Sequence, residues 1–324
     1  MAQIKSLVSK VSKEKLHLSD KAYWKKFRRL IWKHRVLYLM LLPAVVSIFI
    51  FKYIPMPGIQ IAWKDYSYKK GIWGSDWVGW KYFKQFMKSS EFWTATKNTI
   101  KISLLKLAFC FPVPVVFALL LNELRSEKFK KIVQFFTYLP HFISWVVVVY
   151  IMRALFSPYG GLINDIRKAF GLESIFFMGL KSTFYPLLLL SDIWKGVGWS
   201  SIIYIAALSG ADQQLYDAAR VDGANRFQRA WHISLPAIIP TIVLLFIMQM
   251  GDLLSVGLDQ VLLLQQPANY ELSSVLNTYT LRTGIELGKF EYATAIGLTT
   301  SFIGFVLTYI TNKISKKVSD ISLW

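Results

Sequence analysis

Six apolar stretches, each long enough to cross a lipid bilayer, constrain this chain more than any other feature of its sequence. A spanning helix needs about 20 mostly apolar residues, because in hydrocarbon the backbone must satisfy its own hydrogen bonds. The pattern predicts an all-α membrane protein with about six transmembrane helices. The predicted spans are residues 36–57, 99–121, 133–156, 184–208, 237–258 and 293–312.

The composition agrees with a lipid environment and argues against several function classes. Of the 324 residues, 54% are hydrophobic and only 18% are charged. The formal net charge is +19, but much of it flanks the apolar runs, where it orients a membrane protein, so nucleic-acid binding is not expected. The single cysteine, Cys110, allows no disulfide framework, and the four histidines lack ligand spacing. We therefore predict neither a metal site nor a catalytic residue.

Basic residues near the ends of spans prefer the cytoplasmic side. Lys and Arg are concentrated in residues 21–35 and again after residue 312, so both termini are expected in the cytoplasm. The same reasoning places loops 122–132 and 209–235 in the cytoplasm. The other three loops, 58–98, 157–183 and 259–292, are expected on the opposite side, although the first of them is rich in lysine. The chain then divides into a basic cytoplasmic arm (1–35), a transmembrane domain (36–312) and a cytoplasmic tail (313–324).

The N-terminal arm has apolar residues at helical spacing among its basic residues. This pattern predicts an amphipathic helix in the plane of the lipid headgroups, and a merely basic flank that sets the topology is the open alternative. The first apolar run exceeds the length of a signal-peptide core, so we expect it to be retained as an anchor. The apolar positions are Trp24, Phe27, Leu30 and Ile31.

The polar segment between the fourth and fifth spans has the pattern of two short helices joined by a turn. Residues 212–221 favour a helix with Asp212 at the N-cap, Gly223 permits a sharp turn, and Pro236 suits the first turn of the next span. Small residues on a rigid helix flanked by charges are typical of a docking surface. An ordinary solvated connection between two spans has the same physical pattern. The second helix would carry the apolar residues Phe227, Trp231 and Ile233.

The spacing within this segment resembles a known signature. Permease subunits of binding-protein-dependent ATP-binding-cassette (ABC) importers carry Glu-Ala-Ala, three residues, Gly, nine residues, and then Ile-x-Leu-Pro. This chain has Asp217-Ala218-Ala219, Gly223 and Ile233-Ser234-Leu235-Pro236 at that spacing, with Asp in place of Glu. The segments 193–196 (Ile-Trp-Lys-Gly) and 206–208 (Ala-Ala-Leu) resemble the carbohydrate branch of the family. The chain as a whole is similar to permeases of the alginate-importer type.

The resemblance implies a type I ABC importer permease fold and a role for the loop. Residues around Asp217 to Gly223 would form a coupling helix that docks in a cleft of a cytoplasmic ATPase and transmits its closing motion. The shorter Asp217 side chain keeps the charge of Glu, and it leaves a salt bridge to the ATPase open. The coupling-loop residues are Tyr216, Asp217, Ala218, Ala219, Arg220, Asp222, Gly223, Ala224, Ile233, Leu235 and Pro236.

The resemblance also implies partners. The chain contains no Gly-x-x-x-x-Gly-Lys-Ser/Thr motif, so ATP and Mg²⁺ are expected on a separate ATPase dimer, and this chain is expected to be no enzyme and to carry no cofactor. A second permease chain, an extracytoplasmic solute-binding protein and a carbohydrate substrate complete the expected importer, in a bacterial inner membrane. Its mechanism would be alternating access. The basic loop 58–98 favours an acidic sugar polymer as cargo.

Polar residues at membrane depth are candidates for a substrate path, because such groups are costly in lipid and usually face the bundle interior. For Asp192 and Lys195, mutual i,i+3 pairing is the alternative, and for Arg153 and Asp252 it is snorkelling to the interface. For the aromatic residues the alternative is simple packing. The candidates are Tyr150, Arg153, Asp192, Trp194, Lys195, Gln249 and Asp252.

Two other functions are compatible with a multi-spanning chain. A stand-alone secondary transporter or channel would need no docking loop and would show inverted repeats, none of which is evident. A membrane scaffold or enzyme that works through its outer loops would not depend on residues 217–223.

Overall fold

The computed structural model describes residues 21–319 and 321–323. The chain divides into two compact units, one reaching Gln60 and the other running from Ile61 onward. The first unit contains helix α2 (Lys21–Lys33), helix α3 (Arg35–Ile48), the π-helical turn η1 (Phe49–Tyr53) and most of the 3₁₀ helix η2 (Met56–Trp63). In α2, the side chains of Trp24, Phe27, Leu30 and Ile31 are exposed. Residues 1–20 of the predicted arm lie outside the described residues.

The second unit is helical apart from one small hairpin, in which β1 (Lys64–Asp65) pairs antiparallel with β2 (Asp76–Trp77). Its first half contains α4 (Gly71–Gly74), α5 (Lys81–Met87), α6 (Ser90–Leu105), η3 (Lys106–Cys110), α7 (Pro112–Asn122), α8 (Glu127–Tyr138), η4 (Leu139–Phe142), α9 (Trp145–Leu155), α10 (Leu162–Ala169) and η5 (Phe177–Gly179). Its second half contains α11 (Phe184–Leu208), α12 (Gln213–Val221), α13 (Arg226–Arg229), η6 (Ala230–Ser234), α14 (Leu235–Gly251), α15 (Leu258–Leu264), η7 (Pro267–Asn269), α16 (Tyr270–Ser273), α17 (Leu276–Leu281), η8 (Arg282–Glu286) and α18 (Phe290–Ser319).

Four helical stretches in the described part of the chain are long and apolar enough to cross a membrane: Arg35–Trp63, Ser90–Asn122, Arg226–Gly251 and Phe290–Ser319. They overlap the first, second, fifth and sixth predicted spans. The fourth predicted span coincides with the 25-residue helix α11, in which Asp192, Trp194 and Lys195 interrupt the apolar run. At 1.5 Å per residue this helix is roughly 37 Å long, which exceeds the hydrocarbon thickness of about 30 Å.

The third predicted span is not a continuous helix. The segments Glu127–Phe142 and Trp145–Leu155 meet at an angle of 104°. The backbone is extended at Ile143 and at Ser144, the N-cap of α9. A break of this kind frees carbonyl groups that need partners. The ammonium group of Lys195 in α11 supplies them, donating to the carbonyls of Pro140, His141 and Ile143 at 3.3, 2.6 and 2.5 Å.

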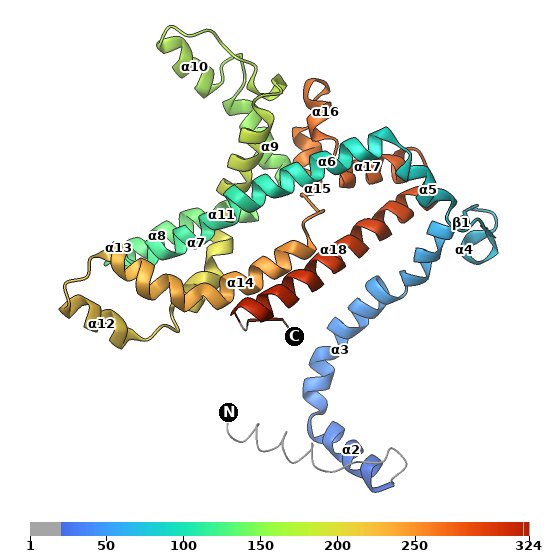
Figure 1. Cartoon of the computed structure of the whole chain (residues 1–324), viewed down its shortest axis with the longest axis horizontal. Helices are drawn as coiled ribbons and strands as arrows, with labels where there is room; N and C mark the ends of the chain where they lie inside the picture. The colour runs from blue at the N-terminus through green and yellow to red at the C-terminus, as the bar shows by residue number, and fades with distance from the viewer. Residues whose placement is uncertain (1–20, 320, 324) are drawn as a thin grey trace. The chain divides into compact units, whose positions relative to one another are not determined.

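Helix α11 is the centre of the second unit, packing against α7, α8 and α14 (Figure 1). Two glycines allow close helix crossings, as in many membrane bundles. A Cβ on Gly198 of α11 would lie 2.2 Å from the Thr137 carbonyl of α8, and one on Gly304 of α18 would lie 2.4 Å from the Gly251 carbonyl of α14. Around α11, one buried core joins α6, α9, α11 and α15, and another joins α7, α11 and α14. A third core joins α5, α6, α17 and α18.

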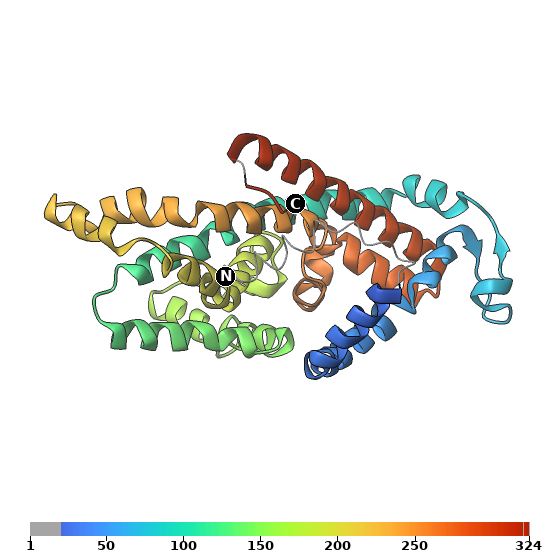
Figure 2. The same cartoon turned by 90° about the horizontal axis from the view of Figure 1, so that it is seen from below.

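Two of the predicted loops lie at opposite ends of the second unit. The 209–235 loop, with α12 and α13, lies at one end, and the β1–β2 hairpin with α5 lies at the other (Figures 1 and 2). The 209–235 loop and the 58–98 segment, which are expected on opposite sides of the membrane, are therefore separated in space (Figures 1 and 2).

Candidate functional site

The 209–235 loop folds as two short helices, as the sequence predicts. Helix α12 begins after Asp212, whose carboxylate accepts a hydrogen bond from the Gln214 backbone N–H at 2.9 Å. Gly223 turns the chain with a φ of +77°, a conformation that costs glycine nothing. Asn225 and Gln228 then form a capping box at the start of α13. The π-helical turn η6, which includes Ile233, leads into α14, where Leu235 is the first residue and Pro236 lies in the first turn.

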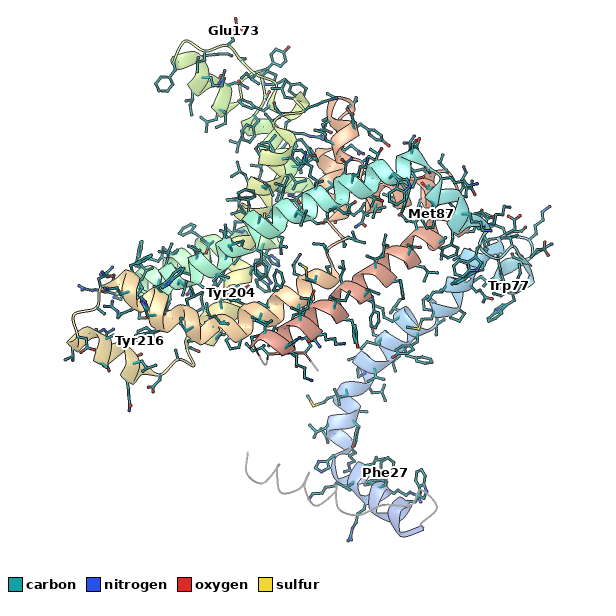
Figure 3. All side chains as sticks on the ribbon, in the orientation of Figure 1. Phe27, Trp77, Met87, Glu173, Tyr204 and Tyr216 are labelled. Carbon is teal, nitrogen blue, oxygen red and sulfur yellow. The ribbon has the colours of Figure 1, made fainter. Side chains whose placement is uncertain are left out.

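One face of α12 packs against the rest of the protein, and the opposite face is exposed. Tyr216 is buried, and its hydroxyl lies 2.8 Å from the Ser234 hydroxyl in η6 (Figure 3 shows its place on α12). Asp217, Ala218 and Val221 are exposed, whereas Ala219 is partly buried. The Asp217 carboxylate forms a 3.0 Å i,i+3 pair with Arg220. The exposed face therefore presents a small side chain at Ala218 beside an ion pair.

The loop is attached to the bundle by Arg229 of α13. Its guanidinium donates to the Ala224 carbonyl at 2.8 Å and to the Glu123 carboxylate at 2.9 Å. Glu123 is the C-cap residue of α7, and Asp222 is the C-cap residue of α12. Between these elements lies a hollow of about 530 Å³ whose lining includes Glu123, Arg125, Arg220, Arg226 and Arg229. The contacts hold α12 at a defined place beyond the end of α7 and α11.

A polar cavity of about 470 Å³ lies within the helical bundle, between η3, α7, α11 and α14. Its polar lining includes Lys106, Asp192, Gln249 and Asp252. Tyr204 also lines the cavity, at a position of α11 nearer the C-terminal end of the helix than Asp192 (Figure 3). Asp192 and Tyr204 are separated by about 18 Å along the helix axis at 1.5 Å per residue. Three predicted path residues, Asp192, Gln249 and Asp252, thus face one cavity.

The other four predicted path residues do not line this cavity. Lys195 is directed to the break between η4 and α9, as described above. Arg153 donates to the Leu263 carbonyl of α15 at 3.0 Å, so it is bound to protein and does not simply snorkel. Tyr150 on α9 and Trp194 on α11 are exposed on the helix surfaces of the single chain. Surfaces of this kind face lipid or a partner chain.

Pairing between Asp192 and Lys195, the alternative considered from the sequence, is wrong. Asp192 instead pairs with Lys106 of η3 at 3.2 Å, and the two side chains are only 27% and 17% exposed. Asp192 and Lys195 are one turn apart on α11, but each binds a group on another element: Asp192 binds Lys106, and Lys195 binds the backbone carbonyls between η4 and α9.

Lys106 is a paired, cavity-lining residue that the sequence analysis missed. It is one of two lysines within the predicted second span, the other being Lys101, and such a charge is costly in lipid unless it is paired, which was the available signal. Gln260, its partner in α15, has no recognisable signal, because it lies in a segment predicted as an outer loop. Glu123, the partner of Arg229, also has no recognisable signal, because it lies in the short predicted loop 122–132.

A second pocket of about 470 Å³ draws residues from all three loops expected on the outer side, and we call it the three-loop pocket. Lys181 pairs with Glu271 at 2.7 Å, and Arg282 donates to the Tyr270 hydroxyl at 2.6 Å. The hydrogen bond from Lys181 lowers the pKa of Glu271 below its ordinary value. Glu91 of α6 completes its charged lining. That three distant loops form one pocket agrees with their placement on one side of the membrane.

Comparisons with known proteins agree with this geometry. The family model of the binding-protein-dependent transport system inner membrane component matches residues 111–320. The polygalacturonan/rhamnogalacturonan transport system permease protein YteP of Bacillus subtilis (strain 168) is 44% identical over 298 residues, covering 91% of this chain and 93% of YteP.

Solved structures agree as well. A bacterial ABC transporter involved in the import of the acidic polysaccharide alginate contains a chain that superimposes with a TM-score of 0.82 at 36% identity, covering 91% of this chain and 99% of that one. The alginate transporter in complex with an alginate pentasaccharide-bound periplasmic protein gives a TM-score of 0.81, also at 36% identity, with coverage of 91% and 99%. The resemblance noted in the sequence is thereby confirmed: this chain belongs to the family of inner membrane components of binding-protein-dependent transport systems.

Proposed function

We propose that this chain is a transmembrane permease subunit of an ATP-driven importer that moves an oligosaccharide or polysaccharide fragment, in particular an acidic one, across the bacterial inner membrane. The names of its relatives support this cargo: one is a polygalacturonan/rhamnogalacturonan permease, and the other belongs to an importer of the acidic polysaccharide alginate. The lysine-rich segment 58–98 adds a physical argument, because a positive surface raises the local concentration of an anionic ligand.

The observation that carries the coupling role is the exposed face of α12, with Ala218 and the Asp217–Arg220 pair, on a helix anchored by Tyr216. This face docks on a separate ATPase subunit, which binds ATP and Mg²⁺. ATP-driven closure of two ATPase subunits brings the coupling helices together and turns the cavity outward, and hydrolysis resets it.

The remaining parts of the proposal concern orientation and assembly. The 209–235 loop and both termini lie in the cytoplasm, and six helical segments cross the membrane, the third as the bent pair α8–α9. A second permease chain, different from this one in keeping with the carbohydrate branch, closes the open side of the cavity. An extracytoplasmic solute-binding protein delivers the sugar, as the periplasmic protein does in the alginate complex.

The docking role is tested by co-purification of the ATPase with a tagged permease. Ala218→Trp places a bulky ring on the exposed face of α12 and is expected to abolish co-purification. The matched control is Ala169→Trp, the same change at an exposed helical position of α10, which should leave co-purification intact. Equal ATPase recovery with both variants would sink the docking role.

The cargo is tested with the complete reconstituted importer and its solute-binding protein. Uronate-containing oligosaccharides should stimulate ATP hydrolysis, and neutral oligosaccharides of equal length should stimulate it less. Stimulation by the neutral series alone would rule out an acidic cargo.

A further inference from the structure

The short helix α15 connects, along the chain, two segments that line different hollows of the second unit. Ser255, Val256 and Gly257, directly before α15, line the bundle cavity. Pro267, Ala268, Tyr270 and Glu271, directly after it, line the three-loop pocket. Because α15 lies between these two lining segments in the chain, a displacement of α15 would move the walls of both hollows.

Although α15 lies in a segment predicted as an outer loop, it is built into the bundle. Gln260 and Val261 are fully buried, and Leu264 nearly so. Val261 and Leu264 belong to the core cluster that also contains Ile102 of α6 and Leu188 of α11. This packing fixes α15 against α6 and α11 in the structure described.

The polar side of α15 is secured by Lys106. Its ammonium has three N–H donors, and it makes three hydrogen bonds: to Asp192 at 3.2 Å, to the Val256 carbonyl at 3.1 Å and to the Gln260 side-chain oxygen at 2.7 Å. The Gln260 amide nitrogen donates in turn to the Leu188 carbonyl at 2.8 Å and to the Ser191 hydroxyl at 2.9 Å.

These contacts leave Lys106 and Gln260 with little capacity to bind a cargo. An ammonium whose donors are all used has none left for a sugar hydroxyl or carboxylate. A charge in the bundle interior is also expensive, and it persists where its contacts are satisfied. The arrangement therefore favours a positioning role over substrate recognition.

We propose that α15 is the movable element of an outer gate, and that Lys106, acting through Gln260 and Val256, is the positioning residue that keeps this gate closed. The inference rests on the proposed import function for its direction, from the three-loop pocket into the cavity. A contact made only in the closed state shifts the equilibrium toward that state by its own free energy. Loss of the Lys106 contacts therefore raises the population of the open gate.

The chain carries its own probe for this gate. Cys110 is its single cysteine, and it lines the bundle cavity. In the complete importer, in intact cells, a charged membrane-impermeant maleimide added from outside should label Cys110 slowly. With Lys106→Met, outside labelling should become about tenfold faster or more, since hydrogen bonds to a charged group are lost. A Cys110→Ala variant identifies the signal that belongs to this residue.

The matched control is Lys101→Met, which removes a lysine of α6 that lies over the Tyr185 ring and has no contact with α15 among those described. It should leave the outside labelling rate unchanged. Gln260→Met is the second variant, because it keeps the Lys106–Asp192 pair and should still accelerate labelling. Size-exclusion profiles of the purified complexes establish that each variant assembles.

Labelling from each side of the membrane distinguishes the opening of an outer gate from a general loss of packing. In inside-out vesicles, the maleimide reaches the cavity from the cytoplasmic end, and the gate variants should label there at the unaltered rate. Wild-type outside labelling in both assembled variants, or equal acceleration from both sides, would overturn the gate. The labelling needs neither sugar nor ATP, so it stands apart from the proposed function, which fails if the ATPase does not co-purify with the wild-type chain.

Discussion

The guanidinium of Arg229 in α13 forms a 2.9 Å ion pair with the carboxylate of Glu123, the residue that follows α7. The two side chains are only 15% and 14% exposed, and they join segments that are 106 residues apart in the chain. The pair therefore connects the 209–235 loop to the C-terminal end of α7, whose first turn lines the bundle cavity at Pro114. The pair gives a first prediction.

Arg229→Met should destabilise the permease by about 2 kcal/mol, because it leaves the Glu123 carboxylate partly buried without its cation. The double variant Arg229→Met/Glu123→Met should lose less than the sum of the two single variants. Thermal unfolding of the purified complex measures all three. Strict additivity would show that the two residues do not interact.

Removal of the Tyr216 hydroxyl should weaken the attachment of α12 to η6 while leaving the exposed face of α12 intact. Tyr216→Phe leaves the Ser234 hydroxyl buried without its partner, at a cost of about 1 kcal/mol. We expect normal ATPase co-purification but less sugar transported per ATP hydrolysed. Tyr159→Phe, at a highly exposed tyrosine, is the control. Loss of co-purification itself would place Tyr216 in docking instead.

Substitutions of Gly223 should follow backbone conformation rather than side-chain volume. Nothing lies within 4 Å of a Cβ added there, so strain at the φ of +77° decides the outcome. Asn tolerates this left-handed region and β-branched residues do not. Gly223→Asn should therefore retain most ATPase co-purification, and Gly223→Val should lose it. Equal recovery with Asn and Val would contradict this account.

Two double-mutant cycles distinguish the partners of Asp192. Lys106→Met with Asp192→Asn should show a coupling energy of about 1 kcal/mol or more, because the two side chains are in contact. Lys195→Met with Asp192→Asn should be additive within about 0.5 kcal/mol, since Lys195 is bound to the carbonyls at the α8–α9 break. Chemical unfolding in detergent measures both cycles. A large coupling only in the second cycle would restore the i,i+3 pair.

Local chemistry made the coupling-loop geometry predictable. An Asp N-cap, a glycine at the turn and a proline in the first turn of the next helix act over a few residues, and Asp212, Gly223 and Pro236 all occupy those places. The contacts of the residues proposed for the substrate path were predicted less well. Asp192, Gln249 and Asp252 line one cavity, as expected for residues of a shared path. Lys195 instead donates to backbone carbonyls, and Lys106, which also lines the cavity, was not among the predicted residues.

The sequence by itself determined a helical membrane protein and the loop signature of its family, because hydropathy over about 20 residues and cap or turn chemistry over a few are local properties. Only the tertiary structure decided which buried charges are paired, where the third span breaks, and that α15 enters the core. A buried polar group is bound by whichever partner the packing of distant helices brings near. That choice is not encoded in the spacing along one helix, as Asp192 and Lys195 demonstrate.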